Sequence, residues 1–118
     1  KNALPADEKA LLDRCSGDVM LFRLKGPLSF GAAKGISERM MLVRNYKILI
    51  LDITDVPRLG VTATLAIEEM MQEAKNNSRK AFVAGANEKV RDRLAKFGVE
   101  DIIETRKQAL ETALNELA

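Results

Sequence analysis

The segment LDITDVPRLGVTATLAIEEM, residues 51–70, holds the residues whose types and spacing could carry chemistry. It begins like a buried strand, passes through a short turn and ends as an amphipathic helix. In α/β proteins, the free N–H groups at the start of such a helix often bind anions. We therefore treat Arg58, Gly60, Thr62 and Thr64 as a candidate anion or phosphate site. From the residue types alone we favour the alternative, in which Thr62 or Thr64 only serves the helix terminus and Arg58 is solvated, because no glycine-rich phosphate-binding motif is present.

Two carboxylates stand in the same segment, Asp52 and Asp55. Such a pair could exchange protons with a substrate or bind Mg²⁺. An aspartate at the end of a parallel strand more often accepts hydrogen bonds from the loop that follows. We favour this turn-structuring role, because the spacing suggests no partner His, Lys or third acid. Gly85 and Asn87 follow the next predicted strand and could line the same crevice, but they also suit an ordinary strand-to-helix turn.

The composition narrows the classes of function. The 118 residues contain no histidine and one cysteine, Cys15. The commonest general base, the commonest transition-metal ligand and a thiolate cluster are therefore missing, and we expect no enzyme, no metal and no cofactor. Lys and Arg number 19 against 17 Asp and Glu, a balance that does not predict nucleic-acid binding. No apolar run approaches the roughly 18–20 residues of a membrane span.

Strand and helix patterns alternate along the whole chain. The periodicity predicts helices at residues 5–15, 31–44, 60–77, 87–97 and 105–117, and strands at 19–24, 28–30, 46–53, 81–84 and 102–103. Alternating strands and helices imply crossover connections and parallel strands. We therefore predict a single layered α/β domain with a mostly parallel central sheet and about four to five helices. One early hairpin, residues 19–30, would add a strand of opposite direction.

The turn after the central strand resembles the signature of STAS domains, the family shared by sulfate transporters and anti-sigma factor antagonists. The signature is approximately D-[LIV]-[ST]-x-V-x-x-[ILM]-D-[ST]-[ST]-[GA]. The positions that fit it are Asp52, Ile53, Thr54, Val56, Leu59, Thr62 and Ala63. Further segments extend the resemblance over almost the whole chain: GPLSFGAA at 26–33 is similar to SulP-type anion transporters, and FVAG at 82–85, VRDRL at 90–94 and FGV at 97–99 are similar to the family's second half.

Two positions depart from the signature. Gly60 stands at its second aspartate, and Val61 stands where anti-sigma factor antagonists carry the serine that a partner kinase phosphorylates. A valine cannot accept a phosphoryl group, so we expect no phosphorylation here, with Thr62 only a weak substitute acceptor. The missing serine and the segment at 26–33 both favour the transporter branch.

The resemblance implies that residues 1–118 are one STAS domain, the C-terminal cytoplasmic part of a bacterial SulP transporter for sulfate or bicarbonate. The first residue, Lys rather than Met, fits a segment of a longer chain. The implied role is regulation and assembly on the cytoplasmic side of the plasma membrane.

The implied partners are the transmembrane domain of the same polypeptide and a second copy in a homodimer. A weak nucleotide or small-anion site in the loops at 57–64 and 85–87 is also implied. The alternative is a free-standing partner-switching protein that binds an anti-sigma factor or kinase.

Overall fold

The structure is a computed structural model of the chain. It describes residues 3–26, 28, 31, 34, 35, 38, 39, 42 and 45–118. None of the helices within these ranges is both long and apolar enough to cross a lipid bilayer.

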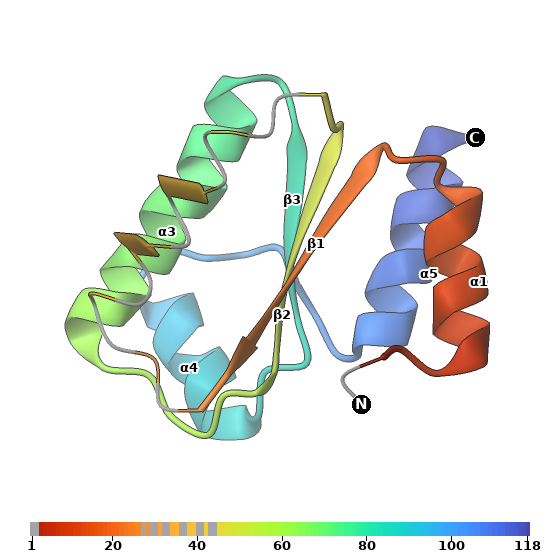
Figure 1. The fold of residues 1–118 in the computed structure, drawn as a ribbon. Coiled ribbons are helices and arrows are strands. Elements are labelled where there is room, and N and C mark those ends of the chain that lie inside the picture. The colour runs from red at the N-terminus through yellow and green to blue at the C-terminus, as the bar shows by residue number, and fades with distance from the viewer. Residues whose placement is uncertain are drawn as a thin grey trace.

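One sheet of four parallel strands forms the centre of the molecule (Figure 1). Its strands lie in sequence order and are β1 (Val19–Lys25), β2 (Ile48–Asp55), β3 (Lys80–Ala84) and β4 (Ile102–Ile103). The predicted parallel sheet is confirmed, and β2 and β3 are its central strands. All carboxyl ends of the strands lie at one edge, where the loops that follow them gather.

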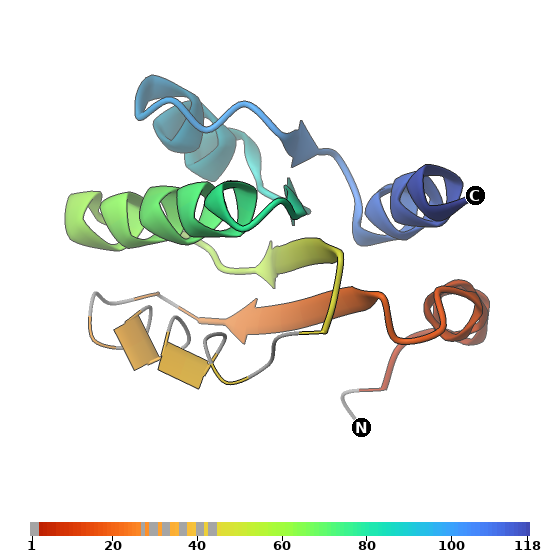
Figure 2. The same ribbon diagram turned by 90° about the horizontal axis from the view of Figure 1, so that it is seen from above.

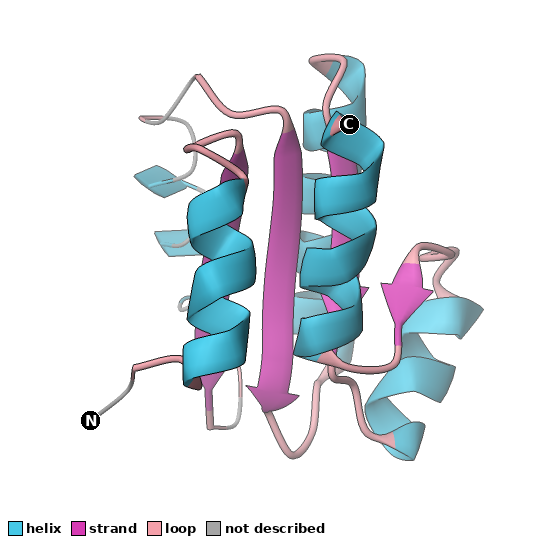
Figure 3. Cartoon of the chain, turned by 90° about the vertical axis from the view of Figure 1, so that its right-hand side faces the viewer, coloured by secondary structure: helices cyan, strands magenta, loops and turns pink. Residues whose placement is uncertain are grey.

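Helices cover both faces of this sheet. One layer consists of α1 (Ala6–Arg14) and α5 (Arg106–Leu117), which pack side by side (Figure 3). The opposite layer consists of α3 (Val61–Asn76) and α4 (Glu88–Lys96), and Figure 2 shows the same two-sided arrangement from above. The predicted helices at 5–15, 60–77, 87–97 and 105–117 are confirmed to within one or two residues.

Strand β2 is buried on both faces from Ile48 to Ile53, as its continuous apolar run predicts. Because side chains alternate along a strand, the two faces receive different residues. Leu49, Leu51 and Ile53 pack into the core under α3 and α4. Ile48 and Ile50 pack into the smaller core under α1 and α5. The next residue in this second series is Asp52, so the alternation turns its carboxylate toward α1 and α5.

The predicted early hairpin differs from the structure where the residues are described. Leu28 forms an isolated parallel bridge with Leu59, not an antiparallel pair with β1. The N–H of Gly26 donates to the carbonyl of Asp55 at 2.9 Å, so the chain leaving β1 still follows β2. The other residues of the predicted strand 28–30 lie outside the described part. In the predicted helix 31–44, the described positions 31, 34, 35, 38 and 39 are helical.

Gly85, directly after β3, is the residue that lets β2 and β3 end close together. Its φ is +82°, in the left-handed region. A Cβ atom at this position would lie 2.2 Å from the Oγ1 and 3.0 Å from the Cα of Thr54. Neither atom can yield easily, because the Cα is backbone and the hydroxyl donates to Asp52 at 2.5 Å.

We therefore predict that Gly85→Ala lowers the free energy of unfolding by about 2–5 kcal/mol, the combined cost of a left-handed alanine and of overpacking. Gly17→Ala is the matched control, since Gly17 has a φ of +83° and nothing within 4 Å of an added Cβ. It should cost only about 1–2 kcal/mol. Urea denaturation measures both, and equal losses would show that the contact with Thr54 is unimportant.

Candidate functional site

Asp52 lies at the carboxyl end of β2 and is 2% exposed. Its Oδ1 accepts hydrogen bonds from the backbone N–H of Thr54 at 3.1 Å and from the Thr54 hydroxyl at 2.5 Å. Its Oδ2 accepts from the Nη1 of Arg106 at 3.0 Å and from the Nε of Arg23 at 3.4 Å. A buried carboxylate with four donors is fully compensated, and it holds the turn after β2 in one conformation.

Arg106 joins this carboxylate to a second one. It is the first residue of α5, and its guanidinium also forms a short hydrogen bond and ion pair with Glu8 of α1, which is buried as well. These two acids raise the pKa of Arg106 above its ordinary value. Glu8, Arg106, Asp52 and Arg23 thus tie α1, α5, β2 and β1 together, and we refer to them as the charge network.

Opposing effects act on the pKa of Asp52. Burial raises the pKa, because it disfavours the charged form. The hydrogen bonds from Thr54 and Arg106 and the charge of Arg106 lower it by more, so that the pKa lies below its ordinary value of 3.8. The carboxylate is therefore ionised at neutral pH and is occupied by its own partners.

The other predicted carboxylate, Asp55, lies apart from this network. It is exposed at the last position of β2, and its carbonyl receives the N–H of Gly26. Because Asp52 faces α1 and α5 in a closed set of hydrogen bonds, the two side chains do not form a shared acid–base pair. Within the described ranges, no group of three or more His, Cys, Asp or Glu side chains could hold a metal ion.

The residues predicted around the start of α3 separate into buried and exposed ones. Thr64 is fully buried, and its hydroxyl donates to the carbonyl of Gly60 at 2.7 Å. This threonine closes the first turn of its own helix and offers nothing to a ligand. Arg58, Val61 and Thr62 are exposed.

Asn87 connects the two loops that were predicted to form one crevice. Its Oδ1 accepts from the N–H of Val90 at 2.8 Å and caps α4. Its Nδ2 donates to the carbonyl of Pro57 at 3.0 Å, so the loop between β2 and α3 is tied to the start of α4. Asn87 therefore positions the loops, and both ends of its amide have protein partners.

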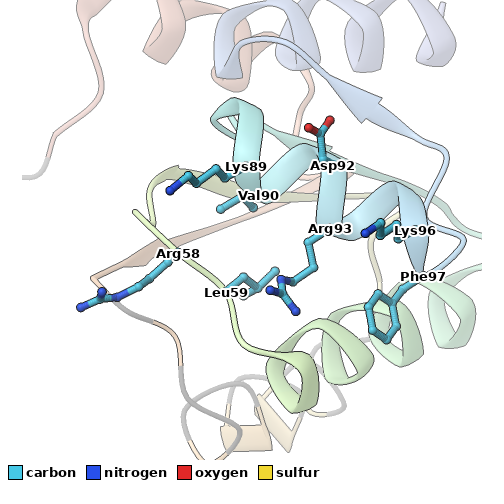
Figure 4. A pocket seen from close by; sticks show the side chains of 8 residues that line it. All are labelled: Arg58, Leu59, Lys89, Val90, Asp92, Arg93, Lys96 and Phe97. Carbon is cyan, nitrogen blue, oxygen red and sulfur yellow. The ribbon is translucent and has the colours of Figure 1, made fainter.

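A groove of about 450 Å³ lies between this loop and α4 (Figure 4). The loop contributes Arg58 and Leu59. The helix and its C-terminal cap contribute the other lining residues, Lys89, Val90, Asp92, Arg93, Lys96 and Phe97. Four cations and one carboxylate give the lining a net charge of +3, more than the +2 of the whole chain. We call this feature the basic groove.

Of the residues predicted for an anion site, only Arg58 lines the basic groove. The sequence-based prediction missed Lys89, Arg93 and Lys96, although their spacing of four and three residues places them on one face of a helix. The stripe of cations on this helix could therefore have been predicted from the sequence. That Arg58 lies near this stripe could not, because its position depends on the hydrogen bond between Asn87 and Pro57.

The charge network leads to a first prediction. Arg106→Gln should lower the free energy of unfolding by about 3–5 kcal/mol, because it leaves two buried carboxylates without their shared cation. Lys107→Gln is the matched control at the next position, since Lys107 pairs with Asp7 on the surface. Its effect should be far smaller. Thermal and urea denaturation of both variants would measure the difference, and similar losses would contradict a structural role for the network.

A second prediction concerns acid. The pKa of Asp52 is lower in the folded chain than in the unfolded one, so the unfolded state takes up the proton first as the pH falls. The stabilisation from the carboxylate is complete above pH 3.8 and is lost as the pH falls through the lowered pKa. Asp52→Asn should therefore be less stable at pH 7 and lose less further stability between about pH 5 and 2. Urea denaturation at several pH values would show this, and parallel pH profiles would refute it.

Comparison with known proteins places these features in a family. The profile of the STAS domain matches residues 11–113. The bicarbonate transporter BicA of Synechocystis sp. is 41% identical over 96 residues, which cover 81% of this chain and 17% of that protein. The BicA of Picosynechococcus sp. is 36% identical over 117 residues, covering 94% of this chain and 21% of that protein. The chain thus spans about a fifth of the length of the curated relatives it matches.

Solved structures agree with this assignment. The STAS domain of a SulP transporter from Vibrio cholerae superposes with a TM-score of 0.75 at 27% identity, covering 99% of this chain and 88% of that one. The unphosphorylated anti-sigma factor antagonist SpoIIAA shares the fold, with a TM-score of 0.72 at 13% identity over 84% of this chain and 90% of that one. The resemblance in the turn after β2, the four-stranded parallel sheet and the profile match all lead to one conclusion: the chain belongs to the STAS domain family.

Proposed function

We propose that this chain is the STAS domain of a SulP-type bicarbonate transporter and acts there as a non-catalytic module for assembly and regulation. The observation that carries the proposal is the sequence match, since two bicarbonate transporters are 41% and 36% identical to it over most of its length. These relatives favour bicarbonate over sulfate as the transported anion. The proposed position is the cytoplasmic side of the membrane, next to the transmembrane domain of the same polypeptide.

The arrangement of polar groups supports a role without catalysis. Asp52, the most buried carboxylate, is saturated by Thr54, Arg106 and Arg23 and cannot serve as a base without breaking the network. The hydroxyl of Thr64 is bound to Gly60.

The first turn of α3 argues against a partner-switching role. Val61 begins the helix and is 49% exposed, so a kinase could reach this position. The side chain has no hydroxyl to phosphorylate. Likeness to SpoIIAA at 13% identity supports only the shared fold. Val61 and Leu65 lie one turn apart on α3, and both are exposed apolar side chains. Such a pair suits contact with another protein surface. We propose that this surface belongs to a second copy of the domain or to the transmembrane part.

Deleting residues 1–118 from the complete transporter tests the proposal. We expect less bicarbonate uptake per transporter molecule in the membrane and a smaller fraction of dimers, because the deletion removes the surface that we propose for assembly. Labelled bicarbonate uptake, immunoblotting of membranes and chemical cross-linking measure these quantities. A chimera that carries the STAS domain of the Vibrio cholerae transporter separates the need for the fold from the need for this particular surface. Unchanged uptake, dimer fraction and membrane level after the deletion would reject the proposed role.

A further inference from the structure

Helix α1 contributes little apolar surface to the core. All nine of its residues are described, and only Glu8 among them is buried. Its two leucines, Leu11 and Leu12, are half-buried. In contrast, α5, the neighbouring helix in the same layer, buries Ala109 and Leu110 completely. Because apolar burial supplies most of the energy that fixes a helix on a sheet, α1 is held less firmly by this force than α5.

Open grooves border α1 on two sides. One of about 480 Å³ lies between Leu12 of α1 and Leu21 of β1. Another of about 360 Å³ lies between the end of α1 at Arg14 and Leu114 of α5. Figure 2 shows α1 on the outer side of its layer, next to β1 at the edge of the sheet. Atoms that line such grooves lack packing partners on one side, so the packing of α1 contributes less dispersion energy than that of an enclosed helix.

Ion pairs join α1 to α5. Glu8 contacts Arg106 through both carboxylate oxygens, and the second contact, from Nη2 to Oε2, measures 3.5 Å. Asp7 pairs with Lys107 at 3.0 Å on the surface. If α1 leaves, Glu8 enters water and does not need a second buried partner, while Arg106 keeps its hydrogen bond to Asp52. Release of α1 therefore leaves none of these charges buried without compensation.

The turn between α1 and β1 has the properties of a hinge. Ser16 and Gly17 both have positive φ values, +56° and +83°. No described atom lies within 4 Å of the position that a Cβ atom of Gly17 would take. A change of the backbone angles at Gly17 therefore meets no packed neighbour. The strand that follows begins at Val19 and is held in the sheet by its pairing with β2.

We propose that α1 is a strap that detaches from the domain as a unit, while the sheet and α5 remain folded. Detached α1 loses its helical structure, because isolated helices shorter than about 12–15 residues are marginal in water. The apolar side chains of Val19 and Leu21, in the core under α1 and α5, become more accessible in this state. A partner that prefers one state shifts the equilibrium between the two. The inference does not rest on the proposed role in transport.

Cys15, the only cysteine in the sequence, reports on this motion. It caps the end of α1 and is 2% exposed. Its thiol donates a hydrogen bond to the carbonyl of Leu11, so the thiol moves with the helix. Burial raises the pKa of the thiol, which makes the docked form slow to react. A thiol reagent therefore labels Cys15 when α1 detaches.

The test follows labelling of Cys15 and amide hydrogen exchange in the wild-type chain at increasing urea concentrations. Iodoacetamide labels the thiol, and mass spectrometry measures exchange in α1, β2 and α5. We expect labelling and α1 exchange to share a weak dependence on urea, because a detaching strap exposes little surface. Exchange in β2 and α5 should have the steep dependence of global unfolding. The same steep dependence for Cys15 and α1, or labelling without exchange of α1, would overturn the proposal.

A pair of variants tests whether the ion pair holds the strap. Glu8→Gln removes the charge that pairs with Arg106. Asp13→Asn removes the same charge from an exposed position of α1, where the partner is Lys9 of the same helix. Glu8→Gln should speed labelling by about tenfold or more, whereas Asp13→Asn should change the rate by no more than about twofold. Equal effects of the two variants would contradict the proposed role of the pair.

Lys107→Gln is the further variant in case Glu8→Gln does not fold, which circular dichroism shows. It removes only the exposed pair with Asp7, so global stability should change little. Labelling of Cys15 should still rise by about two- to fivefold, because this pair also joins α1 to α5. An unchanged labelling rate in this variant would count against a strap held by ion pairs.

Discussion

The ion pairs of Arg106 are the interaction on which the arrangement of this domain depends. They connect the first residue of the last helix with Asp52 in the central strand and with Glu8 in the first helix. A buried carboxylate at the end of β2 would be costly by itself, and the donors from Thr54, Arg23 and Arg106 remove that cost. Because each donor comes from a defined element, the network also fixes how α1 and α5 sit on the sheet.

The charge network is continuous with contacts that order the carboxyl ends of β2 and β3. Thr54 is held by Asp52, and Gly85 packs directly against Thr54. The ends of β2 and β3 are thereby locked together, and Asn87 extends this order to the loop that carries Arg58. A binding groove made from a loop and a helix usually requires such support, because a loop alone loses entropy when a ligand orders it.

Much of the fold was predictable from the sequence for local reasons. The continuous apolar run of β2, the caps at Asn87 and Thr105 and the glycines after α1 and α4 each depend on residues close together in the chain. The early hairpin was predicted but is not what the described residues form, because the pairing of Leu28 with Leu59 is a contact between distant segments that periodicity does not encode. The family resemblance supplied what periodicity could not, since it identified the turn after β2 as a signature.

The candidate site was less predictable than the fold. The residues chosen from the sequence, such as Thr64 and Asn87, carry groups that could bind a ligand. In the structure these groups form hydrogen bonds within the protein itself. Glu8 and Arg106 are 98 residues apart, and nothing in a single sequence indicates that they meet. The stripe Lys89, Arg93 and Lys96 was visible in the sequence, yet its position across a groove from Arg58 depends on the contact between the loop and α4, which only the structure shows.

The helix layers on the two faces of the sheet differ in how their charged groups are exposed to water. On the face of α1 and α5 the buried charges satisfy one another, whereas on the face of α3 and α4 cations and the apolar Val61 remain exposed. A fully satisfied polar network resists rearrangement, because any second arrangement would leave a buried group without a partner.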